Sequence, residues 1–262
     1  MAAVGVLAVG CVVLLAVIAL LRLFFVFRGL GKDRKPLGRS NGSIRTLVVV
    51  GSGGHTAEIL RLMRGLSDTY APRYYIIAET DQLSEEKVHR FEREKYPGKK
   101  DMASVLFLSL PRGPSPLTLH MRSSNPELAY MGVPHDGDDV IYPLQYEVQK
   151  VPRSREMAQS WLSSVFTTLY ATLYSIPLVF RTSPDLILCN GPGTCVPPFA
   201  AGFLMKFLGL TKVSLVYVEM FCRVETLSLS AQLLYYLADH FLVQWPQLHQ
   251  RFPRTTYIGR VI

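Results

Sequence analysis

The chain has 262 residues, of which 49% are hydrophobic, so it has ample material for one large domain with a core. It carries a formal net charge of +8, but six basic residues crowd into the stretch 22–39 with a single acid, Asp33. This basic run lies beside an apolar segment, and no aromatic residues are interleaved with basic ones as in RNA-binding sheets. The charge pattern therefore indicates a membrane flank and argues against a nucleic-acid partner.

The cysteines do not indicate a metal site. There are four of them, at Cys11, Cys189, Cys195 and Cys222. The spacing of Cys189 and Cys195 fits no zinc pattern, and no histidine pair lies nearby. We expect reduced thiols in a cytosolic domain, with no metal ion.

The N-terminal segment predicts a membrane anchor. Residues 1–21 contain no charge, and with 23–27 they are long enough to span a bilayer. A cleaved signal peptide is the alternative, but the neutral start and the Leu-Phe-Phe-Val-Phe-Arg end do not suit one. We expect an uncleaved anchor at 1–27 and a basic, polar linker at 28–43. The positive-inside rule then predicts a single-pass protein with a lumenal N-terminus and a cytosolic main domain.

From residue 44 to 262 the chain alternates between strand and helix patterns. Residues 46–50, Thr-Leu-Val-Val-Val, form a short β-branched run typical of a buried parallel strand. The further expected strands cover 74–78, 104–110, 186–189, 213–218 and 241–243; the expected helices include 81–95 and 196–208. Such alternation implies right-handed crossovers and a parallel sheet, so we predict an α/β, Rossmann-like domain.

Two regions interrupt this alternation. Residues from about 111 to 150 are rich in proline, glycine and polar side chains, and they predict a long, disordered insertion. Residues 161–180 carry no charge, so a second membrane span is one interpretation. Hydroxyl side chains opposite an apolar stripe, together with Pro177, favour an amphipathic helix that packs on the sheet or lies on a membrane. The stripe consists of Leu162, Val165, Phe166, Leu169, Leu173 and Ile176.

Ligands of open α/β sheets bind at the carboxyl ends of the strands, and a glycine loop follows the first strand there. The loop consists of Gly51, Ser52, Gly53, Gly54, His55 and Thr56. Glycines allow close approach of a ligand, and the N-terminus of the following helix attracts phosphate. His55 is a candidate base or diphosphate ligand. The alternative is a histidine that only caps the helix. We also expect Glu58 to lie in the first helical turn.

Two further loops occupy equivalent positions. The first follows the 186–189 strand and contains Asn190, Gly191, Gly193 and Thr194, although glycine and proline also serve ordinary tight turns. The second begins at Glu219, a candidate catalytic acid or base, with Arg223 and Glu225 close behind. An ion pair between Arg223 and Glu219 that only shapes the loop is the alternative.

The first loop also approaches a dinucleotide-binding fingerprint. Gly51 and Gly53 match it, Thr56 replaces the third glycine, and Glu79 ends the second strand where a ribose-binding acid would lie. A membrane-bound oxidoreductase is therefore an alternative function. The apolar leader, the histidine in the loop and the lack of a recognisable substrate domain argue against it.

Four motifs together resemble a known family. They are Val-Val-Val-Gly-Ser-Gly-Gly-His-Thr at 48–56, Cys-Asn-Gly-Pro-Gly-Thr-Cys-Val-Pro at 189–197, Val-Tyr-Val-Glu at 216–219 and Cys-Arg-Val-Glu-Thr-Leu-Ser at 222–228. They resemble the membrane-anchoring subunits of the eukaryotic two-subunit UDP-N-acetylglucosamine transferase of asparagine-linked glycosylation. That family is similar to the N-terminal domain of the bacterial GlcNAc transferase of peptidoglycan synthesis.

The resemblance implies the acceptor-binding half of a GT-B glycosyltransferase at the endoplasmic reticulum membrane. A separate cytosolic subunit would bind the nucleotide sugar, so this chain alone would be inactive. The implied reaction adds the second N-acetylglucosamine to GlcNAc-diphosphodolichol with inversion, and the resemblance implies no cofactor. His55 and Glu219 would be catalytic, and the two glycine loops with Arg223 and Glu225 would bind the acceptor.

Two features concern the partner subunit. The apolar C-terminal residues are expected to dock it, because they would not end an isolated domain comfortably. They are Tyr257, Ile258, Val261 and Ile262. A competing hypothesis is a pure tether, which recruits the catalytic partner to the membrane and contributes nothing to the chemistry.

Overall fold

A computed structural model describes residues 17, 20–24, 42–96, 146–154, 159–191 and 193–261. Residues 17 and 20–24 are helical, whereas the rest of the expected anchor lies outside the described residues. The expected strand at 104–110 and the expected insertion up to residue 145 lie outside them as well.

The described strands form one seven-stranded parallel sheet with the order β3-β2-β1-β4-β5-β6-β7. The strands are β1 (Thr46–Val49), β2 (Arg73–Ala78), β3 (Tyr146–Val151), β4 (Leu186–Asn190), β5 (Ser214–Val218), β6 (His240–Val243) and β7 (Thr255–Tyr257). Successive strands run outward from β1 to one edge, and then from β4 to the other. The topological switch point, where such folds bind ligands, therefore lies between β1 and β4.

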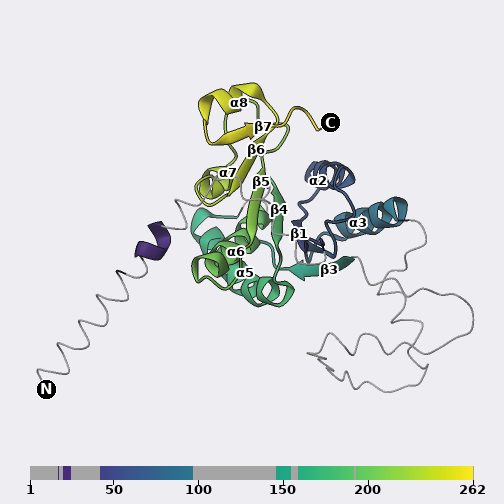
Figure 1. Cartoon of the computed structure of the whole chain (residues 1–262), viewed down its shortest axis with the longest axis horizontal. Coiled ribbons are helices and arrows are strands. Elements are labelled where there is room, and N and C mark those ends of the chain that lie inside the picture. The colour runs from purple at the N-terminus through teal and green to yellow at the C-terminus, as the bar shows by residue number, and fades with distance from the viewer. Residues whose placement is uncertain are drawn as a thin grey trace, which may run out of the picture. The chain divides into compact units, whose positions relative to one another are not determined.

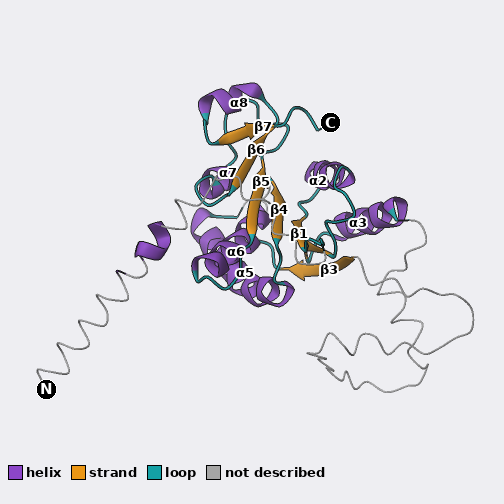
Figure 2. Ribbon diagram, in the orientation of Figure 1, coloured by secondary structure: helices purple, strands orange, loops and turns teal. Residues whose placement is uncertain are grey.

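Helices cover both faces of the sheet. Figures 1 and 2 show α2 (Gly54–Arg64) and α3 (Gln82–Lys95) on one side, and α5 (Trp161–Thr182) and α6 (Val196–Phe207) on the other. The short helices α7 (Leu229–Leu234) and α8 (Pro246–Arg251) contribute Leu234 and Leu248 to the core on the α6 side. This three-layer arrangement confirms the predicted Rossmann-like α/β domain.

Two hydrophobic cores lie on opposite faces of the sheet because side chains alternate along a strand. Val48 of β1 packs with Ile59 of α2 in one core, whereas Leu47 and Val49 pack with Phe199 of α6 in the other. All four strand residues from Thr46 to Val49 are buried. A continuous apolar run is thus the sequence signature of this central strand.

The two edge strands differ from the prediction. β3 includes residues that the sequence assigns to the irregular insertion, so the predicted insertion extends too far toward its C-terminal end. Only Val151 of β3 is buried, which explains why the strand lacks an apolar run. β7 has three residues, two of them exposed, and was not predicted.

A buried ion pair attaches α3 to β2. The Arg73 guanidinium donates to both carboxylate oxygens of Glu92, at 2.7 and 2.8 Å, and Tyr75 donates to the same carboxylate at 2.5 Å. Both charged side chains are 2% exposed. The bidentate geometry and the tyrosine hydroxyl satisfy charges that would otherwise be costly to bury.

The amphipathic helix expected at 161–180 is present as α5, which continues through Pro177. Among the described residues, Leu162–Thr182 is the helix that is long and apolar enough to cross a membrane. It packs against α6 on one side of the sheet. Its buried positions include Ser164, Ala171 and Ser175, whereas Leu162 and Phe166 of the apolar stripe are exposed.

Candidate functional site

The three loops predicted from sequence meet at the carboxyl edge of the sheet. Gly191 forms the contact point, with a φ of +75° that suits glycine. A Cβ atom at this position would lie 2.7 Å from the His55 ring atoms Cε1 and Nδ1 and 2.4 Å from Cγ of Met220. The loops 51–56, 190–194 and 219–228 therefore converge on the His55 imidazole.

The first loop leads into α2 with an open N-terminus. Gly53 is the N-cap residue with a φ of 67°, and no side chain among the described residues caps the helix. Gly53 and Gly54 are exposed, and a Cβ atom at either would meet no atom within 4 Å. The first backbone N–H groups of α2 thus face an accessible region, as in phosphate-binding loops.

Thr56 supports the loop from inside. Its buried hydroxyl lies 2.5 Å from the Gly51 carbonyl oxygen, to which it donates, and 2.7 Å from the Ser84 hydroxyl. Asp81, the N-cap residue of α3, accepts from the backbone N–H of Ser84 at 3.1 Å. Thr56 was expected to contact the ligand, but its hydroxyl bonds instead fix the loop against α3.

His55 lies in the first turn of α2, and it does not cap the helix. Burial lowers the pKa of its imidazole below the ordinary value of 6.5, while Asn190 and the charge of Glu58 oppose that shift. Its buried Nδ1 atom has no hydrogen-bond partner among the described residues. At neutral pH the ring is therefore uncharged, the form that can accept a proton.

Asn190 is the second polar group without a partner. It ends β4, is fully buried, and neither its amide oxygen nor its amide nitrogen is hydrogen-bonded to a described residue. It lies beside His55, although their contact does not reach hydrogen-bond geometry. A buried amide without partners is costly, which is a common feature of sites that a ligand completes.

Glu219 follows β5 and is fully buried. One carboxylate oxygen accepts from the backbone N–H of Met220 at 2.9 Å, and the other accepts from the backbone N–H and hydroxyl of Ser228. Burial raises the pKa of this carboxyl group, and the hydrogen bonds partly oppose the shift. The geometry favours a loop-shaping role, but the partner is Ser228, and among the salt bridges of the described residues none joins Glu219 to the exposed Arg223.

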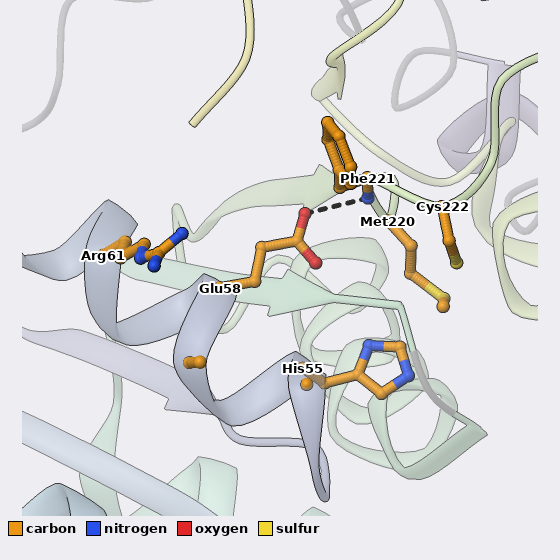
Figure 3. Close-up of a pocket in the computed structure, with 8 residues that line it drawn as sticks. His55, Glu58, Arg61, Met220, Phe221 and Cys222 are labelled. Atoms are coloured by element: carbon orange, nitrogen blue, oxygen red, sulfur yellow. Dashed lines mark hydrogen bonds between the residues drawn. The ribbon is translucent and has the colours of Figure 1, made fainter. Parts of the chain in front are cut away.

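A cavity of about 440 Å³ opens beside His55 (Figure 3). His55 and Glu58 point into it from α2, and the 220–222 loop forms the opposite wall. Its lining residues are Gly54, His55, Ala57, Glu58, Arg61, Met220, Phe221 and Cys222. The dashed line in Figure 3 marks the hydrogen bond by which the Phe221 backbone N–H donates to Glu58 at 2.9 Å.

Several of these lining residues were not predicted. Glu58 was expected in the first helical turn, but the helix begins at Gly54 and Glu58 therefore lies in the second turn. The signal that reveals it is spacing, since His55, Glu58 and Arg61 recur every three residues and share one helix face. Nothing local in sequence marks Met220 or Phe221 as part of the same cavity.

The other predicted site residues do not line the cavity. Ser52, Gly193, Arg223 and Glu225 are exposed, and Thr194 is half-buried. The described residues contain no group of three or more His, Cys, Asp or Glu side chains that could hold a metal ion.

The predicted partner-binding tail lies near the cavity. Tyr257 and Ile258 are exposed, whereas the Val261 backbone N–H donates to the Gln244 side chain at 3.1 Å. The Arg260 guanidinium lies 4.5 Å from the Trp245 ring centroid. Ile262 lies outside the described residues.

The sheet, its switch point and the convergent glycine loops define a Rossmann-like α/β domain. The family described as "Oligosaccharide biosynthesis protein Alg14 like" matches residues 46–113 and 135–261, and the chain belongs to this family. The family expected from the sequence motifs is thereby confirmed.

Individual relatives agree. The chain is 43% identical over 248 residues to the UDP-N-acetylglucosamine transferase subunit ALG14 of Rattus norvegicus. The aligned region covers 95% of this chain and 94% of the relative. It is 41% identical to the Homo sapiens protein of the same name, with 94% of each chain covered. Their names agree with the transferase-subunit function that the resemblance implies.

A solved structure is also similar. The crystal structure of Acinetobacter baumannii MurG matches with a TM-score of 0.45 and 12% sequence identity. The match covers 82% of this chain and 45% of the MurG chain.

Proposed function

We propose that this chain is the acceptor-binding subunit of a UDP-N-acetylglucosamine transferase, and that it works at the endoplasmic reticulum membrane with a separate donor-binding partner. The reaction is the addition of the second N-acetylglucosamine to GlcNAc-diphosphodolichol, with inversion, in oligosaccharide synthesis for N-glycosylation. Relatives named as UDP-N-acetylglucosamine transferase subunits support the reaction class. The observation that carries the acceptor assignment is the uncharged His55 beside an open helix N-terminus and the unpartnered Asn190.

The geometry suits a diphosphate and a sugar. The exposed Gly53 and Gly54 leave room for phosphate oxygens near the N–H groups at the start of α2. Asn190 can donate and accept, so it can satisfy a sugar hydroxyl or a phosphate oxygen. His55, uncharged and next to both, can take the proton of the attacking hydroxyl or donate a hydrogen bond to phosphate.

The other residues play supporting roles in this proposal. Glu219 holds the 219–228 loop through Ser228, and Thr56 holds the glycine loop through Ser84. Arg223 and Glu225 are exposed in the same 219–228 loop, where they are available to the acceptor or the partner. No step requires a metal ion or cofactor in this proposal.

The domain organisation completes the proposal. Residues 1–27 anchor the chain with a lumenal N-terminus, and 28–43 link the anchor to the cytosolic domain. The exposed Tyr257 and Ile258, with Val261 and Ile262, dock the donor-binding subunit. Removal of residues 260–262 should release that subunit in a co-purification assay while the circular dichroism spectrum stays unchanged, and retention of the complex would refute the docking assignment.

The test is transfer of labelled N-acetylglucosamine from its UDP form to a short-chain GlcNAc-diphospholipid. The full chain is expressed alone, with its candidate donor-binding partner, and as the partner alone. We expect product only when both chains are present. Product from either chain alone would contradict the shared-subunit proposal. Tight binding of a nicotinamide or flavin cofactor, with no transfer, would instead support the dinucleotide alternative.

A further inference from the structure

The apolar side of helix α5 is exposed and is directed away from the core. Its exposed apolar positions, here called the α5 outer face, are Leu162, Val165, Phe166, Leu169, Leu173 and Phe180. Leu162 is 78% exposed and Phe166 is 70% exposed. These residues belong to a stretch of twenty residues, 161–180, that contains no charged side chain. Single exposed leucines are ordinary, but a continuous uncharged helix face indicates an interaction surface.

The orientation of α5 is fixed by its polar side. The small residues Ala171 and Ser175 are fully buried there, and they allow close packing. The Ser175 hydroxyl donates to the Ala171 carbonyl at 2.8 Å, and Thr168 donates in the same way to Ser164 at 2.7 Å. Hydroxyl groups that bond within their own helix can be buried without loss of a partner.

A second contact prevents the helix from turning over. The hydroxyl group of Thr167 donates to the backbone carbonyl of Ser154 at 2.7 Å, and the Thr168 hydroxyl oxygen lies 3.1 Å from the same carbonyl oxygen. Ser154 is buried and lies just beyond β3. These contacts attach the N-terminal half of α5 to the sheet, so the α5 outer face stays directed away from the core.

The neighbouring helix α6 and the residues after it also expose apolar side chains. α5 packs along α6 on the same side of the sheet (Figure 2). Leu204 of α6, and Leu208 and Leu210 just after it, are exposed by 39%, 54% and 57%. Two adjacent segments thus present leucine side chains to the surroundings.

We propose that the α5 outer face lies on the surface of a lipid bilayer, with the helix axis in the membrane plane. Leu162–Thr182 has the length and hydropathy of a membrane span, yet its hydroxyl side is packed on the protein. A helix held in this way can enter the lipid only by its apolar side, as interfacial helices do to a depth of about 5–10 Å.

Residues around this face match a membrane interface. Tyr170 and Tyr174 are exposed beside the leucines, and tyrosine is enriched at the headgroup level. The exposed Lys212 lies after α6, and the Arg181 side chain at the C-terminal end of α5 is 72% exposed, although it is paired with Glu147 at 3.1 Å. Such cations attract anionic lipid headgroups.

The length of the chain before the sheet is compatible with this contact. The proposed anchor ends at residue 27 and the domain begins at residue 44, so the sixteen residues between them reach at most roughly 60 Å. This lipid contact deepens the proposed membrane association. Its test does not depend on transferase activity, so the two can fail separately.

The test uses the full chain in vesicles of phosphatidylcholine and phosphatidylinositol. Cys11 and Cys222 are replaced by serine, because Cys222 is exposed, while Cys189 and Cys195 are buried. One variant carries Leu169→Cys on α5, labelled with an environment-sensitive fluorophore. The matched control carries Leu83→Cys, an exposed leucine on α3 across the sheet.

Lipids with a doxyl quencher on the acyl chain should reduce the fluorescence at position 169 by roughly two-fold or more, while iodide in water should have little effect. The label at position 83 should show the reverse. Quenching of position 169 by iodide would show a water-exposed face and overturn the proposal. Protection from both quenchers would show that protein covers this face, either a second copy, the partner or another segment of this chain, and would overturn it too.

Discussion

Glu58 on α2 accepts a hydrogen bond from the backbone N–H of Phe221 at 2.9 Å, across 163 residues of chain. The same carboxylate oxygen accepts a hydrogen bond from the Gln244 side chain, whose own oxygen accepts from Val261. One acidic side chain thus joins the helix that carries His55, the opposite wall of the cavity and the C-terminal tail. We infer that Glu58 positions the 220–222 loop.

Glu58→Ala should loosen that loop. The Phe221 N–H loses a charged acceptor, which costs about 1.5–3 kcal/mol locally. Trp245 reports the change, because its indole N–H donates to the Phe221 carbonyl at 2.6 Å and its ring lies 5.2 Å from the Phe221 ring. In a Trp161→Phe background, Trp245 is the remaining tryptophan, and its emission should shift to longer wavelength in Glu58→Ala.

The conservative variant Glu58→Gln keeps a side-chain oxygen for Phe221 and should retain most of the wild-type emission. Glu94→Ala is a surface control, since the Glu94 side chain is 57% exposed on α3. Equal spectra for wild type and Glu58→Ala would show that Glu58 does not hold the loop.

Gly191→Ala should disrupt the convergence of the three loops. The added methyl group would lie 2.7 Å from the His55 ring and 2.4 Å from Met220 in a left-handed conformation, so the loop must move. We expect a loss of stability of about 1–3 kcal/mol in urea denaturation, together with loss of transfer. A fully stable and active variant would contradict the described packing.

Gly54→Ala separates folding from ligand binding. A Cβ atom there meets no atom of the described residues within 4 Å, and alanine favours the helix by roughly 0.5–1 kcal/mol over glycine. The stability should therefore hold or rise. If phosphate oxygens approach this position, the KM for the lipid acceptor should nevertheless increase. An unchanged KM would remove the glycine loop from the acceptor site.

The buried pair of Arg73 and Glu92 should contribute strongly to stability. Glu92→Gln leaves Arg73 charged and buried without its carboxylate, a change that costs about 3–5 kcal/mol in comparable cases. The control Glu94→Gln breaks the exposed pair with Arg64, where the cost should stay within about 1 kcal/mol. Similar urea midpoints for the two variants would show that the buried pair is not the stronger one.

The central strands and the three loops were predictable because each depends on a local pattern. β1, β2 and β4 are short, mostly apolar runs that are buried nearly throughout, and β5 and β6 are short runs with alternate residues half-buried; the glycine loops follow β1 and β4 directly. β3 and β7 were not predicted because edge strands bury few side chains and lack such runs. The meeting of Glu58 with Phe221 depends on tertiary packing, which no local pattern encodes.

Helix α5 illustrates a different limit. Its length and amphipathic character follow from the sequence, but the pattern alone does not say which face contacts the protein. In the structure the small and hydroxyl residues Ala171 and Ser175 pack inward, and Leu162 and Phe166 point outward. This arrangement, with hydroxyl side chains inside and apolar side chains outside, is the inverse of the usual one. It leaves few buried polar groups without partners, because the hydroxyl groups bond to backbone carbonyls of their own helix.

The lowered pKa of His55 predicts a pH dependence of stability. Burial favours the neutral ring, so the folded chain binds a proton less readily than the unfolded chain, whose histidine has the ordinary pKa of 6.5. The contribution of His55 to the free energy of unfolding is therefore intact above pH 6.5 and is lost as the pH falls through the lower pKa of the folded state. The free energy of unfolding, measured by urea denaturation at a series of pH values, should therefore fall less steeply below pH 6.5 in His55→Gln than in the control His249→Gln on α8. Identical pH dependences of the two variants would contradict the burial of His55.

The most direct test of the central claim is the transfer rate of His55→Ala in complex with the donor-binding partner. Arg64→Ala, at an exposed position near the end of the same helix, is the control. We expect a fall of about 100-fold or more for His55→Ala, with the complex still intact by co-purification, and little change for Arg64→Ala. An intact complex in which His55→Ala transfers N-acetylglucosamine at the wild-type rate would contradict the account and leave this chain as a tether.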